Sequence, residues 1–369
     1  MRSTSWTRSL AYLAIIWAVG LTILLAGAEL VLRLTDDGWS RTLRLNVVRS
    51  RTYDYHVAHL YEWQTPTIRY VRDEYGLRDD CSSAGDIDIL TMGGSTTDQR
   101  FLAQQATFQA VMQRELVRVA GPGICVSNAG VDGHSTHGHL RAFSDWFPLI
   151  PRLRPKLFVF SIGINDADFT RTGPSVLEDE IAGRAGALKE LQIAQVGLWL
   201  RETLSGLWGR RPVHAGQKEI ARRSSDYTQV RLAADTAERA ARNAEGFRLR
   251  LRRMLAYARA NGAEAICVTQ PHRQVRTVDG KKRGIRFAFD AKGPGNTYGG
   301  LDYDYSLRLL YRVMREECGQ SRLIDLYNAD FDNGDFYDYV HTTPSGARKI
   351  GREIARSITN SELMNQLLE

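Results

Sequence analysis

Apolar residues gather in five short runs between residues 87 and 326. The runs are Ile87–Met92, Ile124–Asn128, Leu157–Ile162, Ala265–Thr269 and Leu323–Leu326. Each run is nearly continuous instead of alternating with polar residues, which is typical of a strand covered on both faces of its sheet. The pattern therefore predicts five strands of a buried sheet.

Helical patterns lie between these runs. Phe108–Val119 is amphipathic, and Val230–Asn261 is rich in Ala and Arg and stops at Gly262. Thr343-Pro344 is typical of an N-cap followed by a first-turn proline, and apolar residues then recur every three or four positions. Because strands and helices alternate, we expect an α/β fold with a parallel sheet and helices on both faces.

Two stretches of the chain are longer than the connections that such a fold requires. Residues 171–228 are charged and have a helical pattern, so we expect a helical insertion there. Residues 271–300 are rich in glycine and have the pattern of a long loop. Both are expected near the strand ends, where they would either shape a substrate cleft or decorate the surface.

The N-terminus holds 20 residues without a charge between Arg8 and Glu29. A membrane-spanning helix needs about 20 apolar residues, so the segment is long enough to cross a bilayer. Ala26-Gly27-Ala28 resembles a cleavage site and would make the segment a signal peptide, but the length of the run favours an uncleaved anchor. The predicted parts are a cytoplasmic N-terminus, a transmembrane signal anchor, a membrane-proximal lead-in and the main domain, at residues 1–8, 9–34, 35–80 and 81–369.

Composition narrows the function classes. The chain of 369 residues is 43% hydrophobic and 25% charged, as ordinary globular proteins are. Its net charge of +7 comes from scattered basic residues, with no basic block interleaved with aromatic residues and no zinc-finger or RNA-binding signature. We therefore expect no nucleic-acid partner, and a basic surface near anionic lipid or glycan is the simpler interpretation.

Residues suited to acyl chemistry follow the predicted strands. Gly94-Ser95 follows the first strand, Gly133 the second, Asn165 the third, and Asp338 with His341 follows the fifth. Ligands of open α/β sheets bind beyond the carboxyl ends of the strands, so these residues are expected at one edge. His341 could take the proton of the Ser95 hydroxyl, and one helical turn would place Asp338 beside the imidazole.

A tetrahedral intermediate also needs hydrogen-bond donors for its oxyanion. The candidates are the backbone N–H groups of Ser95 and Gly133 and the side-chain amide of Asn165. Ser95 alone would more simply be a helix cap, and Asn165 part of a turn. The expectation of a catalytic site depends on all the segments occurring together, each after its own strand.

These segments resemble the SGNH (GDSL-type) hydrolase family over about residues 70–358. Ser95, Gly133, Asn165 and the Asp338–His341 pair stand at the positions of its four blocks, although Gly94 replaces the aspartate of the GDS motif. The resemblance implies a three-layer, flavodoxin-like fold with a five-stranded parallel sheet and metal-free esterase or acyl-transfer chemistry, with no cofactor. Membrane-tethered relatives also resemble this chain at Tyr75-Gly76-Leu77-Arg78 and at Gln270-Pro271.

The strand order 2-1-3-4-5 that the resemblance implies places Cys81 near Cys125 and Cys267 near Cys318, so two disulfides are expected; four buried thiols are the alternative.

His134, His137 and His139 have the spacing of metal ligands, but no carboxylate or cysteine completes such a site in the sequence, so no bound metal is expected. His272 and Arg273 are expected either to line the cleft or to face solvent.

The sequence thus predicts a serine-dependent acyl esterase, with its catalytic domain outside the cytoplasm. Its expected substrate is an O-acylated envelope or secreted carbohydrate. An O-acetyltransferase of such a polysaccharide and a non-catalytic glycan-binding protein are the two alternatives.

Overall fold

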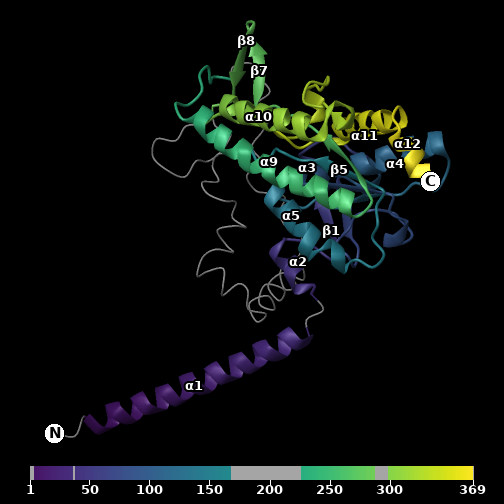
Figure 1. The fold of residues 1–369 in the computed structure, drawn as a ribbon. Helices are drawn as coiled ribbons and strands as arrows, with labels where there is room; N and C mark the ends of the chain where they lie inside the picture. Colours follow the sequence, from purple (N-terminus) through teal and green to yellow (C-terminus); the bar gives the residue numbers. More distant parts are fainter. Residues whose placement is uncertain (1–3, 36–37, 168–225, 287–297, 369) are drawn as a thin grey trace.

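A parallel five-stranded sheet forms the centre of the computed structural model, which describes residues 4–35, 38–167, 226–286 and 298–368 (Figure 1). Its strands are β3 (Ile89–Gly93), β4 (Val126–Asn128), β5 (Leu157–Ser161), β6 (Glu264–Val268) and β9 (Leu323–Ile324). They lie in the order β4-β3-β5-β6-β9, and every pair is parallel. The predicted strand order and fold class are confirmed, with each strand starting or ending a few residues from its apolar run.

Alternate residues of the strands enter two separate cores. Leu90, Met92 and Phe158 pack on one face with residues of α5 (Thr136–Asp145), α9 (Thr236–Ala260) and α10 (Gly300–Cys318). Ile89, Leu157 and Val159 pack on the other face with residues of α4 (Phe108–Ala120), α11 (Pro344–Thr359) and α12 (Leu363–Leu368). Strand side chains point to opposite faces in turn, so continuous apolar strands hold both helical layers.

The lead-in before residue 81 is built into this fold. It contains α2 (Ser40–Arg44) and an antiparallel pair, β1 (Arg51–His56) and β2 (Thr67–Arg72). Side chains of β2 alternate between exposed and buried, and Ile68 and Tyr70 join the core below β3. Arg78 also forms a bridge with Asn128 at the edge of the sheet.

The stretch after β6 also differs from the expectation of a long loop. Residues Val275–Val278 (β7) and Lys281–Gly284 (β8) form an antiparallel hairpin. Its two-residue turn is Asp279-Gly280, with φ of 50° and 70°. Asp-Gly is a preferred sequence for such a turn because both central residues take positive φ, so the hairpin signal was present in the sequence. The predicted insertion at residues 171–228 lies almost wholly outside the described residues.

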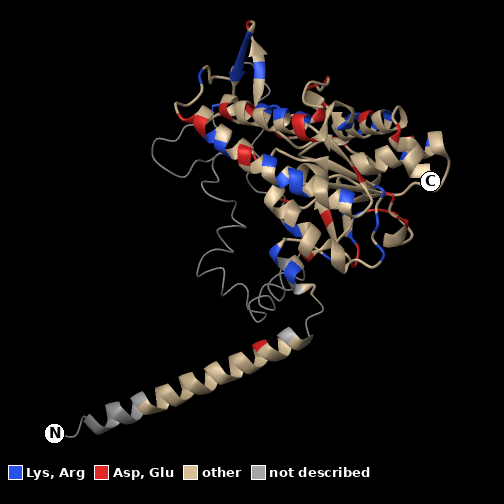
Figure 2. Cartoon of the chain, viewed as in Figure 1, with Lys and Arg blue, Asp and Glu red and all other residues tan. Residues whose placement is uncertain are grey.

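One helix of the described residues is long and apolar enough to cross a membrane. It is α1 (Thr4–Thr35), with its apolar span at Tyr12–Leu32. Figure 2 shows that most of the helix carries neither acidic nor basic residues. An N-terminal segment of this kind is either an anchor or a signal peptide.

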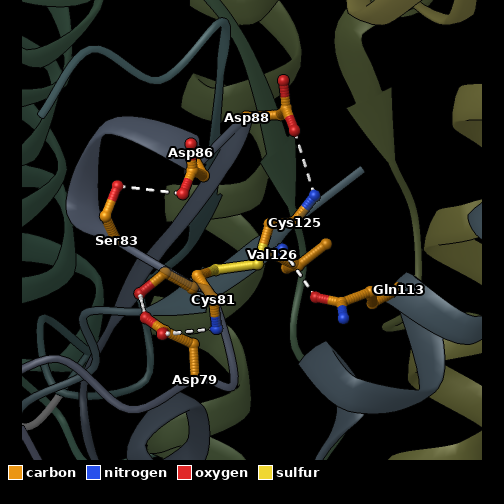
Figure 3. Close-up of a disulfide and its surroundings, with 9 residues drawn as sticks. Asp79, Cys81, Ser83, Asp86, Asp88, Gln113, Cys125 and Val126 are labelled. Atoms are coloured by element: carbon orange, nitrogen blue, oxygen red, sulfur yellow. Dashed lines mark hydrogen bonds between the residues drawn. A yellow bond between two sulfur atoms is a disulfide. The ribbon is translucent and has the colours of Figure 1, made fainter. Parts of the chain in front are cut away.

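Two disulfides join the cysteines. Cys81 is bonded to Cys125 beside the first residue of β4, as Figure 3 shows, and Cys267 in β6 is bonded to Cys318 at the end of α10. Each bond closes a long segment, with sequence separations of 44 and 51 residues. These are the two pairings that the strand order suggests.

Removing one disulfide should lower stability measurably. The double substitution Cys81→Ala/Cys125→Ala frees a long loop in the unfolded chain, so we expect the free energy of unfolding to fall by about 2–4 kcal/mol. Urea unfolding of both proteins followed by circular dichroism measures the change. Four alkylatable thiols in the native wild-type protein would contradict the pairing.

Candidate active site

Ser95, His341 and Asp338 form a continuous hydrogen-bonded chain at the carboxyl edge of the sheet. The Nε2 atom of His341 lies 2.7 Å from Oγ of Ser95, and its Nδ1 atom lies 2.6 Å from Oδ2 of Asp338. Ser95 is the first residue of α3 (Ser95–Asp98), directly after β3. The predicted acid, base and nucleophile are therefore brought together in the order that proton transfer requires.

The segment that carries His341 is a bend and not the helical turn expected from its spacing. Oδ1 of Asp338 accepts backbone hydrogen bonds from Val340 and His341, at 2.9 and 2.7 Å. A bridge between Phe336 and Thr342 closes the bend. The Asp338 carboxylate thus fixes the backbone with one oxygen and the imidazole with the other.

The two ionisable partners shift each other's pKa in opposite directions. Burial lowers the pKa of His341, but the Asp338 charge and its hydrogen bond outweigh burial, and the pKa is raised above 6.5. Burial raises the pKa of Asp338, but the His341 charge and hydrogen bonds outweigh it and the pKa is lowered. The pair therefore favours an ionised Asp338 and stabilises a protonated His341.

The loops after β4 and β5 place the other predicted residues. Gly133 has a φ of 79°, a backbone conformation that glycine adopts without strain. Nδ2 of Asn165 donates to the carbonyl of His134, next to Gly133, at 2.8 Å. Asp166 accepts from the backbone N–H and the hydroxyl of Thr136, which ties the β5 loop to the start of α5. Ser95, Gly133 and Asn165 therefore follow three adjacent strands.

Gly94, where the sequence departs from the GDS motif, is in close contact with this arrangement. A Cβ atom at position 94 would lie 2.4 Å from Nδ2 of Asn165 and 3.0 Å from the carbonyl oxygen of His134. Atoms at such distances would overlap, so this backbone leaves no room for a side chain. In this chain the glycine allows the Asn165 amide to approach the nucleophile turn.

A buried ion network lies behind the nucleophile. Asp98, the last residue of α3, is 1% exposed and pairs with Arg72 at 2.5 Å and with Arg100 at 3.3 Å. Arg100 also pairs with Asp132, the neighbour of Gly133, at 3.3 Å. Burial raises the pKa of Asp98, but the arginine charges outweigh it and the pKa is lowered. The network joins the helix of Ser95 to the loop of Gly133.

The lead-in supplies the arginines that sequence reasoning did not assign. Arg72 ends β2 and donates to the carbonyls of Asn128 and Gly130 at 2.9 and 2.6 Å. Arg78, part of the Tyr75–Arg78 segment, donates to the carbonyls of Asp98, Gln99 and Leu102. Sequence reasoning assigned no role to these arginines, although the alternation of charged residues with apolar ones in the lead-in is typical of a β-strand.

A pocket adjoins the triad. Its lining includes Thr96, next to the nucleophile, and Val340 and Thr342, on either side of His341. Gln270 lines it too: its amide donates to the Thr96 hydroxyl at 2.6 Å and accepts from the backbone N–H of Ile164 at 3.1 Å. The Gln270-Pro271 segment marked the end of a strand in the sequence, and its side chain connects the β5 and β6 loops to α3.

The remaining histidines have structural contacts. Nε2 of His134 lies 2.6 Å from the carbonyl oxygen of Leu45, and its ring packs on His139. Burial lowers the pKa of His134 to about 4 and that of His139 well below 6.5. His272 is buried 3.4 Å from Asp304, so it neither lines the cleft nor faces solvent. Among the described residues no group of His, Cys, Asp or Glu could hold a metal ion.

Comparisons with known proteins give structural neighbours only. No family model matches, and no curated relative matches. The neighbours include a lipolytic protein of the G-D-S-L family from Desulfitobacterium hafniense (11% identity, TM-score 0.38, 73% of this chain and 98% of that one). They also include an acetylxylan esterase from Geobacillus stearothermophilus (13% identity, TM-score 0.39, 73% of this chain and 93% of that one). A third is a lipase/acylhydrolase from Enterococcus faecalis (14% identity, TM-score 0.40, 74% of this chain and 95% of that one).

Structural likenesses with TM-scores of 0.38 to 0.40 carry no argument about this chain. Its sheet has the order that the resemblance implies, and the residues of all four blocks lie at the carboxyl ends of the strands or in the loop before the last long helix. The structure thus has the parallel five-stranded α/β architecture that the sequence resemblance implies.

Ester hydrolysis should depend on the protonation of His341. Because its pKa is raised, the base is inactive at low pH, and kcat/KM for a small acetyl ester should rise with an apparent pKa above 6.5. Asp338→Asn should lower that apparent pKa and reduce kcat about a hundredfold or more. pH–rate profiles measure both effects. The exposed His56→Asn is the control, and an unchanged profile in Asp338→Asn would contradict this role of the carboxylate.

The close approach at Gly94 gives a second test. Gly94→Ala should push the Asn165 amide away and lower kcat about tenfold or more, with a small change in KM, because an oxyanion donor acts mainly in the transition state. Gly85→Ala is a matched control, since its Cβ would meet no atom closer than 3.5 Å. Equal kcat values for both variants and the wild type would show that Asn165 has no such role.

Proposed function

We propose that this chain is a serine-dependent ester hydrolase that removes acyl groups, in the first place acetyl, from an O-acylated glycan. The observation that carries the proposal is the hydrogen-bonded chain from Ser95 Oγ through both nitrogens of His341 to Asp338. A serine that served only to start the helix would need none of these partners.

In the proposed reaction His341 takes the proton of Ser95 as Oγ attacks the ester carbonyl. The resulting imidazolium is stabilised by the Asp338 carboxylate, and His341 then gives the proton to the leaving sugar oxygen. Water, deprotonated by His341, attacks the acyl-Ser95 and releases the carboxylic acid. No step needs a metal ion or a cofactor.

The developing oxyanion requires donors that are already in place. The backbone N–H of Ser95, that of Gly133 and the amide of Asn165 are the proposed donors. Support comes from the bonds that hold them: Asn165 to the carbonyl of His134, and Asp98 through Arg100 to Asp132. These bonds fix the relative positions of the three loops before substrate binds.

The pocket beside Thr96 and Val340 lies next to the nucleophile in sequence, although no triad residue lines it. Phe108, Leu326 and Ile350 give it an apolar lining, and the polar groups of Gln270 and Thr342 lie nearer the triad. Its interior has room for about one water molecule, so the proposal favours acetyl, a small acyl group. The glycan part of the proposal follows from the family resemblance and from the N-terminal helix.

We further propose that α1 is an uncleaved anchor that holds the domain outside the cytoplasm. Its span, Tyr12–Leu32, is long enough to cross a bilayer. The two disulfides support this location, because cytoplasmic thiols are normally kept reduced. A domain tethered there meets envelope or secreted polysaccharides.

The decisive experiment is hydrolysis of a small acetyl ester by the purified full chain in detergent. Wild type should turn over and Ser95→Ala should lose about a thousandfold or more of kcat. A fluorophosphonate should label wild type but not the variant. Absence of Ser95-dependent turnover and labelling would leave only a glycan-binding role. Acetyl transfer to an added oligosaccharide faster than hydrolysis would instead identify an O-acetyltransferase.

A further inference from the structure

Gln99 directly follows the short helix of the nucleophile and has an unusual backbone conformation. It caps α3 with φ of 48° and ψ of 43°, and its backbone N–H donates to the carbonyl of Ser95 at 2.9 Å. Of the five described residues other than glycine that have a positive φ, Gln99 is the buried one, at 4% exposed. Glycine, asparagine or aspartate normally occupies such a position. A buried glutamine there indicates a role of its side chain.

The side chain of Gln99 uses both ends of its amide. Nε2 donates to the hydroxyl of Thr342 at 3.1 Å, and Oε1 accepts from the backbone N–H of Phe108 at 2.7 Å. Because a backbone N–H can bond only to the amide oxygen, the amide has one orientation. Thr342 directly follows His341, and Phe108 is the first residue of α4. The amide thus joins the end of the nucleophile helix to the segment of the base and to α4.

The bond between Gln99 and Thr342 crosses the gap between nucleophile and base. The bend that carries His341 has its own hydrogen bonds to Asp338, and these fix its shape but not its distance from α3. The Gln99–Thr342 bond starts one turn after Ser95 and ends one residue after His341. It therefore spans the same gap as the 2.7 Å contact between Nε2 of His341 and Oγ of Ser95.

Burial makes this bond a firm one. Gln99 and Thr342 are both buried, so neither side chain can exchange its partner for bulk water. A buried amide or hydroxyl that loses its partner keeps the cost of its desolvation, which opposes any movement that separates the two. Thr342 also lines the pocket beside Thr96, so the bond holds one wall of that pocket as well.

We propose that Gln99 is a positioning residue that holds His341 at the distance from Ser95 that proton transfer requires. The inference rests on the proposed esterase function and adds to it a residue outside the triad and the oxyanion donors. A general base acts over a hydrogen-bond distance of about 2.6–3.2 Å. A displacement of about 1 Å can slow an enzyme about a hundredfold, so a bond that fixes this distance contributes to kcat.

The first test removes the amide in the full chain. Gln99→Leu should lower kcat for a small acetyl ester about tenfold or more, with little change in KM, because base and nucleophile separate while substrate contacts stay. Labelling of Ser95 by a fluorophosphonate should slow by the same factor. Steady-state kinetics and labelling time courses measure the two effects.

The other end of the bond gives a second pair of variants, which also serves if Gln99→Leu fails to fold. Thr342→Val keeps the shape of the side chain but loses the hydroxyl, and it should lower kcat as Gln99→Leu does. Thr342→Ser keeps the hydroxyl and should retain most of the activity. Equal kcat values for Thr342→Val and Thr342→Ser would overturn the inference.

Gln109→Leu is the matched control. Gln109 is 2% exposed, and its amide donates to the hydroxyl of Thr91 at 3.0 Å and to the carbonyl of Thr97 at 3.1 Å. Both partners lie on the nucleophile side of the gap, and the Thr97 carbonyl keeps a second donor, Nδ2 of Asn128, at 2.8 Å. Urea unfolding should show a similar loss of stability in both leucine variants, with kcat of Gln109→Leu near that of wild type. Equal losses of kcat in both would contradict the positioning role.

The ¹⁵N NMR signal of Nε2 of His341 separates this inference from the proposed catalysis. Measured on the full chain with labelled histidine, at a pH where His341 is neutral, it reports whether Nε2 accepts a hydrogen bond. Ser95→Ala gives the signal without that bond; Gln99→Leu should move toward it, and Gln109→Leu should not. Such a shift supports the positioning role even if no ester is turned over. An unmoved signal in Gln99→Leu, with Ser95-dependent turnover in wild type, would keep the esterase and reject the role of Gln99.

Discussion

The buried carboxylate of Asp98 is the group on which the geometry of the site depends. An unpaired charge in a protein interior costs several kcal/mol, so Asp98 can be buried only with Arg72 and Arg100 beside it. Those three residues belong to the lead-in, to the helix of Ser95 and to the loop that follows it. Arg100 continues to Asp132 beside Gly133. The contacts that pair the charge of Asp98 therefore also fix the nucleophile Ser95 relative to the loop of Gly133.

The parallel sheet supplies the second constraint. Its strands are buried on both faces, and their carboxyl ends converge on one edge, where loops can carry polar residues without breaking the core. Gln270 after β6 and Asn165 after β5 reach across to neighbouring loops. The turn after β3 and the loop after β4 are thus each held by a side chain that follows another strand.

Much of this was readable from the sequence. Continuous apolar runs predicted the sheet, and Thr343-Pro344 predicted the start of α11. The spacing of Ser95, Asp338 and His341 predicted which residues meet, but the bend at Asp338 depends on hydrogen bonds of its own carboxylate and was mistaken for a helical turn. The role of the lead-in arginines could not be predicted, because the partner of Arg72 lies 26 residues away at Asp98. Pairing at such range has no local signal.

In the proposed mechanism Ser95 carries the acyl group. The most direct measurement is peptide mapping by mass spectrometry after brief exposure of the full chain to an activated acetyl ester and an acid quench. We expect one added acetyl group on the peptide that contains Ser95, and none in His341→Ala, whose serine lacks its base. Acetyl groups on lysines alone, or equal labelling of Ser95 in both proteins, would contradict it.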